Sequence, residues 1–205
     1  MRVFAVKLVL CDEYIMEGGT ELFMDNGASS YRRFLEGDNE GFVEIIRDYK
    51  DGLMLYLNGY VHDIHDAEDL MEDTFVKIYA KRPRYSQNYS FKTWLYTIGR
   101  NVAIDHLRRE KRRNARSLED MGDTVADKVQ LEQDYLKKED DVILISAMDR
   151  MNSEYRQTLY LKYFEDLSNE EIGKVLGKTR RQVENLLYRG KQALKSIIEQ
   201  EDNLR

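Results

Sequence analysis

The segment spanning residues 89–113 carries the side chains best suited to binding nucleic acid. Phe, Trp and Tyr residues at its start lead, without a helix-breaking residue, into a strongly basic sequence. Residues 100–116 hold seven Lys and Arg against two acidic residues, in a chain whose net charge is -6. Aromatic rings can stack on unpaired bases, and the cations can bind phosphates. On a helical wheel, one exposed stripe holds Trp94, Asn101, Asp105, Arg108 and Arg112.

A second basic segment lies near the end of the chain and has the start and stop signals of two linked helices. The pairs Ser168/Glu171 and Thr179/Gln182 both have capping-box spacing, and Gly177 supplies a turn between them. This pattern predicts a helix-turn-helix unit, whose second helix enters the major groove of DNA. Base contacts are expected from Arg180, Arg181, Glu184 and Asn185. Phosphate contacts are expected from Lys178, Arg189 and Lys191.

The composition favours helices throughout. The 205 residues include one proline, 34% are charged, and 42% are hydrophobic, which is enough to form real cores. Apolar residues recur at helical spacing over residues 42–60. A second helix is predicted to begin near Asp66, whose carboxylate can cap it, and to end before Pro83. We therefore expect an all-α protein.

Charge is segregated along the chain. Residues 117–141 hold nine acidic residues and three lysines, whereas residues 172–195 hold seven Lys and Arg and one acid. The acidic stretch is poor in large apolar residues, which is typical of a mobile linker. We expect two small helical domains, at residues 30–113 and 139–200, joined by a flexible acidic linker at residues 114–138.

Residues 1–29 do not follow the helical pattern and form an expected N-terminal extension. Two explanations remain open: the extension is genuine, or residues 17–19 reflect a translated ribosome-binding sequence ahead of the true initiator, Met24. The apolar run at the start is too short to span a bilayer. Cys11 has no partner for an internal disulfide. These features predict a cytoplasmic protein without membrane insertion.

Three motifs, at residues 66–75, 91–109 and 163–190, resemble one family in their order and spacing. This family is the extracytoplasmic-function (ECF) class of bacterial sigma factors, within the sigma-70 family. The resemblance covers residues 30–200 and implies a sigma region 2 domain followed by a sigma region 4 helix-turn-helix domain. It also implies three partners: core RNA polymerase, promoter DNA, and an anti-sigma factor able to hold the protein at the membrane.

The resemblance assigns a role to each motif. It implies core-polymerase contacts by Asp66, Glu68, Asp69, Leu70, Glu72 and Phe75. It implies minus-ten recognition and DNA melting by Arg84, Tyr85, Asn88, Tyr89, Phe91, Trp94, Tyr96, Asn101, Asp105, Arg108, Arg109 and Arg112. The loop at residues 84–88 would cup an extruded minus-ten base. It implies minus-thirty-five recognition by Lys178, Thr179, Arg180, Arg181, Glu184, Asn185, Arg189 and Lys191.

Two other functions fit parts of the sequence. A stand-alone helix-turn-helix repressor or activator would bind duplex DNA by itself and would not need the aromatic cluster around Trp94. A histidine-aspartate phosphohydrolase is suggested by His62-Asp63 and His65-Asp66, but no histidine precedes His62 to complete a metal site. We expect neither an enzyme, nor a metal site, nor a cofactor.

Overall fold

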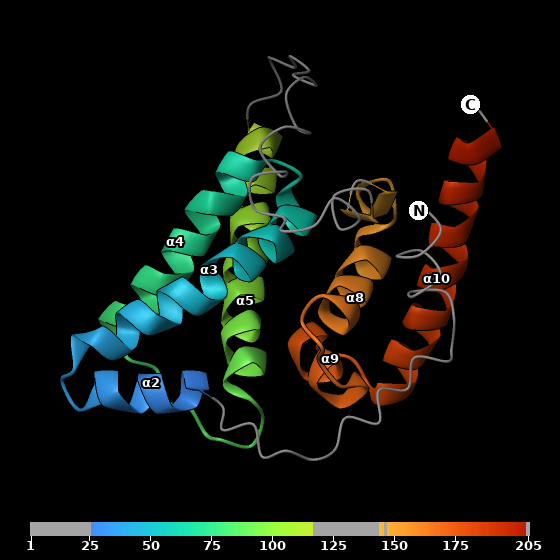
Figure 1. Cartoon of the computed structure of the whole chain (residues 1–205). Coiled ribbons are helices and arrows are strands. Elements are labelled where there is room, and N and C mark those ends of the chain that lie inside the picture. Colours follow the sequence, from blue (N-terminus) through green and yellow to red (C-terminus); the bar gives the residue numbers. More distant parts are fainter. Residues whose placement is uncertain (1–25, 117–143, 146, 204–205) are drawn as a thin grey trace.

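The computed structural model describes residues 26–116, 144–145 and 147–203, and all of its regular structure in these ranges is helical (Figure 1). The predicted all-α fold is confirmed. The expected N-terminal extension and acidic linker lie outside the described residues, except for residues 26–29 and 114–116, which belong to helices. The helices are α2 (Asn26–Leu35), α3 (Asn39–Val61), α4 (Ile64–Lys81), α5 (Phe91–Arg116), α8 (Ser153–Tyr163), α9 (Asn169–Leu176) and α10 (Arg180–Asn203).

Helices α2 to α5 form the first domain, in which α3 packs against each of the other three. An aromatic cluster joins α2, α3 and α4, with the ring of Phe34 lying 4.8 Å from Phe42 and 5.3 Å from Tyr79. Helix α5 crosses α3 closely at Gly99, where a Cβ atom would meet the Leu53 side chain at 2.8 Å. A side chain at this position would therefore require the buried Leu53 side chain to move.

The capping of α4 differs from the prediction. Asp63 is the N-cap residue, and its carboxylate accepts hydrogen bonds from the backbone N–H groups of His65 and Asp66. The helix therefore begins at Ile64, and Asp66 lies in its first turn, where an acid still favours the positive end of the helix dipole. The other end agrees with expectation, since α4 stops at Lys81, before Pro83.

Helices α8 to α10 form the second domain. Ser168 and Glu171 make the predicted capping box at the start of α9, and Gly177 ends that helix with a φ of 67°. The second predicted box is also present: the Thr179 hydroxyl accepts from the Gln182 N–H, and the Gln182 side chain accepts from the Thr179 N–H. The α9–turn–α10 unit is therefore the helix-turn-helix that its sequence predicts.

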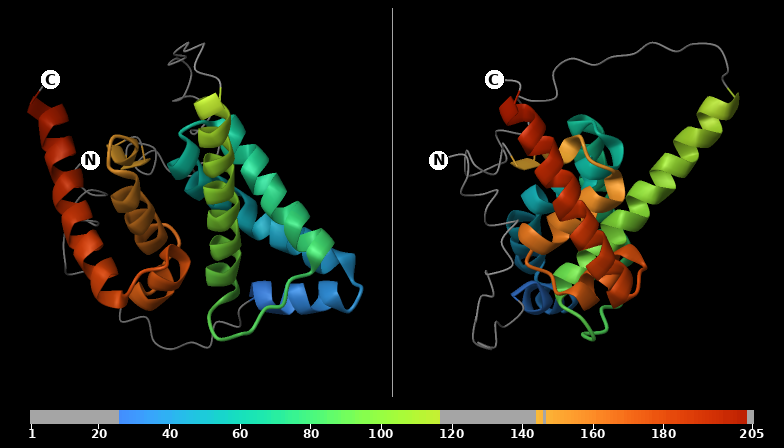
Figure 2. Two further views of the ribbon diagram at one scale, coloured as in Figure 1. Left: turned by 180° about the vertical axis from the view of Figure 1, so that it is seen from behind. Right: turned by 90° about the vertical axis from the view of Figure 1, so that its right-hand side faces the viewer.

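The two domains lie against each other through α5 with α9 and α3 with α8. The Tyr160 hydroxyl donates a 3.1 Å hydrogen bond to the Gly52 carbonyl oxygen, and the ammonium of Lys92 lies 3.1 Å from a carboxylate oxygen of the buried Glu165. The C-terminal half of α5 stands clear of this contact, as the right-hand view of Figure 2 shows. The first half of the basic helix is therefore covered, and the second half is open.

Candidate nucleic-acid interface

A group of aromatic rings surrounds the start of α5. The Trp94 ring lies 5.0 Å from Tyr31, 5.6 Å from Tyr85 and 5.1 Å from Phe91, and is half-buried among them. Phe91 is fully buried. Aromatic pairs at these distances add to the burial energy of their rings. Trp94 therefore helps to hold the domain together and exposes only part of its ring.

The loop between α4 and α5 is fixed by hydrogen bonds to its backbone. The Tyr31 hydroxyl donates to the Pro83 carbonyl oxygen at 2.7 Å, and the Tyr85 hydroxyl donates to the Tyr89 carbonyl oxygen at 2.7 Å. Burial raises the pKa of Tyr31 to about 12, so this hydroxyl remains a donor at neutral pH. Gln87 has a φ of 55°, which turns the chain at the tip of the loop.

A hollow of about 500 Å³ opens beside this loop. Tyr85, Gln87, Asn88 and Tyr89 line one side of it, and Tyr89 is 40% exposed. The hollow thus combines aromatic surface with amide groups that can donate and accept hydrogen bonds. Such a lining suits a single nucleobase taken out of the stack.

The predicted minus-ten residues fall into three groups. Tyr85, Asn88, Tyr89 and Trp94 gather at the loop and hollow. Tyr96 does not join them, since it is 1% exposed and packs 5.2 Å from Tyr56, under the second domain. The remaining predicted polar residues are exposed on the loop and the later turns of α5: Arg84, Asn101, Asp105, Arg108, Arg109 and Arg112.

The exposed half of α5 carries arginines whose ion pairs are open to solvent. Arg108 is 70% exposed and lies 3.6 Å from Asp105, and Arg113 is 76% exposed and lies 3.2 Å from Glu110. Exposed pairs of this kind contribute about 0–1 kcal/mol, so a phosphate can displace them at little cost. The geometry suits a helix lying along a nucleic-acid backbone.

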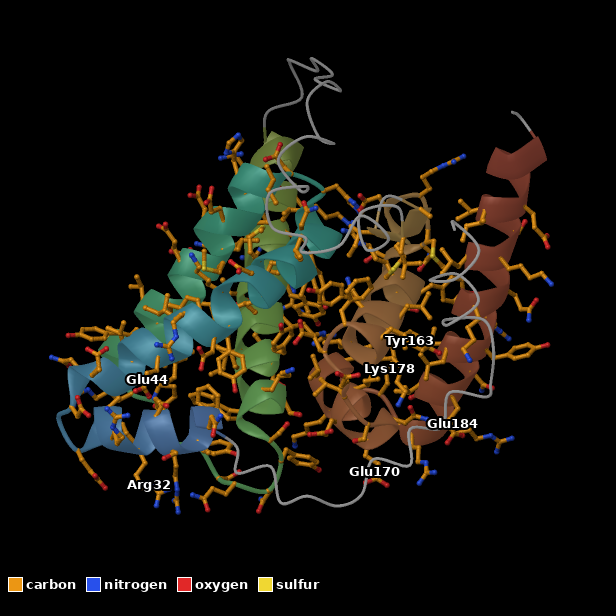
Figure 3. All side chains as sticks on the ribbon, viewed as in Figure 1. Arg32, Glu44, Tyr163, Glu170, Lys178 and Glu184 are labelled. Atoms are coloured by element: carbon orange, nitrogen blue, oxygen red, sulfur yellow. The ribbon has the colours of Figure 1, made fainter. Side chains whose placement is uncertain are left out.

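The start of α10 presents its polar side chains to solvent (Figure 3). Arg180 donates to Glu184 at 3.0 Å and lies 3.4 Å from Glu170, and the Glu184 carboxylate raises the pKa of its guanidinium. Glu184 is therefore occupied by Arg180 within the unbound protein. Arg181 and Asn185 are exposed, and the side chain of neither forms a hydrogen bond or ion pair with another described residue.

The remaining predicted residues of this helix-turn-helix differ in their surroundings. Lys178 forms a 2.9 Å ion pair with Glu154 of α8, and Lys191 lies 5.8 Å from the Tyr163 ring. Thr179 serves as the cap of α10, and Arg189 is exposed. Tyr188, which sequence reasoning did not select, is 68% exposed and lies two turns after Arg181 on the same face. The seven-residue spacing between Arg181 and Tyr188 could have placed Tyr188 on this face from the sequence alone.

The predicted polymerase-binding residues of α4 do not share one environment. Asp69 and Glu72 are exposed, and Asp66 and Glu68 are partly exposed. Leu70 and Phe75 are 1% and 4% exposed and belong to the core. Beside the acids, an apolar groove of about 550 Å³ lies between α3 and α4. Its lining includes Phe42, Ile46, Met71, Val76 and Tyr79, with Glu68 and Glu72 at its edge.

Within the described ranges, no three His, Cys, Asp or Glu residues come together in a way that could hold a metal ion. None of the described helices combines the length and the apolar character needed to cross a membrane.

Comparison with protein-family models finds two matches in chain order. Residues 45–113 match Sigma-70 region 2, and residues 141–194 match Sigma-70, region 4. The first range contains most of the first domain, and the second contains α8, α9 and the start of α10.

Curated relatives and solved structures agree with these matches. The chain is 29% identical over 171 residues to the ECF RNA polymerase sigma factor SigW of Bacillus subtilis, covering 80% of this chain and 91% of the relative. It is 27% identical over 154 residues to SigM of the same species, covering 75% and 93%. The fold is similar to that of the sigma factor RpoE from Bartonella quintana, which was co-crystallised with the anti-sigma factor NepR. The TM-score is 0.62 and the sequence identity is 20%, and the match covers 77% of this chain and 96% of that one. CnrH, in complex with the cytosolic domain of CnrY, matches with a TM-score of 0.57 at 18% identity, over 85% and 95%.

Proposed function

Because the chain belongs to the ECF class of the sigma-70 family and is an RNA polymerase sigma factor, we propose a separate role in transcription initiation for each of its surfaces. The family consists of initiation factors rather than enzymes. The observation that carries the proposal is the coexistence of two separate features: a hollow lined by aromatic and amide side chains beside the α4–α5 loop, and a helix-turn-helix. A stand-alone repressor is not favoured, because it would need only the second of these.

The first domain reads and melts the minus-ten element. The hollow beside Tyr85, Asn88 and Tyr89 receives one extruded base, and the exposed ring of Tyr89 supplies stacking surface. Stacking on an aromatic side chain contributes about 1–3 kcal/mol per base. The exposed cations of α5, including Arg109 and Arg112, follow the adjoining phosphates. Phe91 and Tyr96 act from the core, by supporting the residues that touch DNA.

The second domain reads the minus-thirty-five element through the start of α10. Arg181 and Asn185 lie free on its exposed face and are the main base readers. Arg180 approaches the DNA as a pair with Glu184, which limits the directions that its guanidinium can take. Lys178 and Arg189 bind phosphates, after Lys178 leaves its pair with Glu154.

The exposed face of α4 and the adjoining groove form the docking surface for core polymerase. Glu68, Asp69 and Glu72 supply negative charge at its edge, and Val76 supplies apolar surface at 64% exposure. Leu70 and Phe75 shape this surface from beneath. A protein interface with an apolar centre and a charged rim has the usual anatomy of a specific contact.

An anti-sigma factor is a further partner of this chain in our proposal. The solved structures that share its fold include two complexes, one with NepR and one with CnrY.

Transcription with purified components tests the function. The full chain is added to sigma-free core RNA polymerase on a supercoiled genomic promoter library, and the 5′ ends of the RNA are sequenced. We expect discrete new start sites that share two upstream elements. Tight duplex binding by the protein alone, with no polymerase-dependent start sites, would instead identify a stand-alone regulator.

A further inference from the structure

The hollow beside the α4–α5 loop has a second wall, which no sequence motif indicated. Ala28, Ser29 and Arg32 of α2 line it opposite the loop residues. The site is therefore built by two elements separated by more than forty residues of chain.

Helix α2 is held firmly against the loop by the residue that precedes Arg32. Tyr31 is 1% exposed, its ring packs against Trp94, and its hydroxyl bonds to the Pro83 carbonyl oxygen. Successive helix residues point about 100° apart, so this buried Tyr31 turns Arg32 outward. Arg32 is exposed, and Figure 3 shows it on α2 pointing away from α3.

The two neighbouring arginines of α2 differ in their partners. Arg33 forms ion pairs with Asp38 at 2.6 Å and with Glu44 at 2.8 Å, which tie α2 to α3. The Arg32 side chain forms no ion pair and no hydrogen bond with another described residue. Its charge is therefore available to an anion that enters the hollow.

We propose that Arg32 binds a backbone phosphate of the unpaired DNA strand whose extruded base occupies the hollow. This inference rests on the proposed function. A guanidinium can hold a phosphate through two parallel hydrogen bonds. The side chains of Ser29, Gln87 and Asn88 can meanwhile reach the polar edge of the base. Helix α2 thus positions the strand, while the loop receives the base.

The test uses the full chain assembled with core polymerase, and a promoter fork whose non-template minus-ten strand is single-stranded, taken from a promoter found in the transcription experiment. Three variants are compared with wild type: Arg32→Ala, Arg32→Lys and the control Arg47→Ala. Arg47 is 67% exposed on α3 and pairs only with the adjacent Asp48 among the described residues, so its substitution removes the same charge away from the hollow. Fork binding is measured over a series of salt concentrations.

We expect Arg32→Ala to weaken fork binding several-fold and to reduce the slope of log affinity against log salt by about 0.7, the value for one phosphate contact to a single strand. Arg32→Lys should restore most of the slope, and Arg47→Ala should behave as wild type. A scan with single uncharged methylphosphonate linkages locates the contact. One linkage should weaken wild type but not Arg32→Ala.

Equal slopes for Arg32→Ala and Arg47→Ala would overturn the role of Arg32, and so would an unchanged methylphosphonate profile in Arg32→Ala. In both cases wild type still binds the fork, so the proposed function stands. If the wild-type chain gives polymerase no affinity for any promoter fork, the proposed function fails and the Arg32 contact fails with it.

Discussion

The hydroxyl of Ser90 donates a 2.6 Å hydrogen bond to Oε1 of Glu171, 81 residues later in the chain. Thr93 donates to the same oxygen at 3.0 Å, while Oε2 of Glu171 accepts from Ser168 in the capping box of α9. One carboxylate therefore closes a local cap and joins the two domains. Although burial opposes its charge, these hydrogen bonds lower the pKa of Glu171.

This contact places the two DNA-reading domains too close for a promoter. The minus-ten and minus-thirty-five elements are 25 base pairs apart by name, or about 85 Å of B-DNA. In the structure the Lys174 ammonium of α9 lies 5.0 Å from the centre of the Tyr89 ring at the hollow. We therefore expect the domains to separate when the protein engages a promoter.

Glu171→Gln should favour the separated form. The side-chain oxygen of Gln can accept from Ser168 and complete the capping box. Its side-chain nitrogen then replaces the oxygen that accepts from Ser90, and an amide nitrogen is not an acceptor. Bonds to a charged group contribute about 1.5–3 kcal/mol. We expect small-angle X-ray scattering of the full chain to give a larger radius of gyration than for wild type. The control is Glu170→Gln, since Glu170 pairs only with Arg180 of the second domain among the described residues. Equal radii for all three proteins would contradict the role of Glu171.

Tyr89→Ala should impair DNA melting while leaving folding nearly unchanged. Its ring is 40% exposed, so its loss should leave the free energy of unfolding nearly unchanged, while one base loses about 1–3 kcal/mol of stacking. Trp94→Ala should also destabilise the domain, because Trp94 contacts three other rings. The measurements are promoter opening by permanganate reactivity and stability by urea unfolding. If Tyr89→Ala opens promoters at the wild-type rate, its ring does not hold a base.

The features that the sequence predicted well are local ones. A capping box such as Ser168 to Glu171 is encoded within four residues, and a left-handed turn such as that at Gly177 requires one particular residue. Amphipathic spacing likewise located α3 and α4 with no knowledge of their neighbours. The choice of cap for α4 was wrong, because Asp63 and Asp66 are chemically equivalent acceptors and the start of the turn decides between them.

The features that could not be predicted depend on distant parts of the chain. Tyr96 looked like one more aromatic side chain of the DNA-binding helix, yet α8 and Glu165, more than fifty residues later, bury it completely. The wall that α2 adds to the hollow also could not be predicted, because Arg32 and Asn88 lie far apart in the chain and belong to no common motif. Periodicity identifies the buried face of a helix, but it does not identify which other element covers that face.

Arg181→Ala should relax recognition of the minus-thirty-five element. Its side chain is exposed at the start of α10, the part of the helix that we propose enters the major groove of DNA. Loss of one good base contact costs about 1–3 kcal/mol at a single base position. The measurement is holoenzyme binding to promoters carrying each single-base change in that element. Lys195→Ala is the control. Lys195 is 54% exposed farther along the same helix, and its substitution removes the same charge. An Arg181→Ala protein with wild-type preference at every position would show that Arg181 does not read bases.

Val76→Asp should weaken docking on core polymerase. Val76 is 64% exposed on α4 and lines the apolar groove, so a partner that covers it would bury an unpaired carboxylate. Burial of such a charge should cost at least about 2 kcal/mol, or roughly thirtyfold in affinity. Fluorescence anisotropy of the labelled full chain with core polymerase measures this loss. Val43→Asp makes the same change at a valine of α3 that is 51% exposed and outside the groove lining, and it should bind nearly as wild type does. Wild-type affinity in Val76→Asp would exclude the groove from the docking surface, and the polymerase contact would then have to rest on the acidic edge at Asp69 and Glu72 alone.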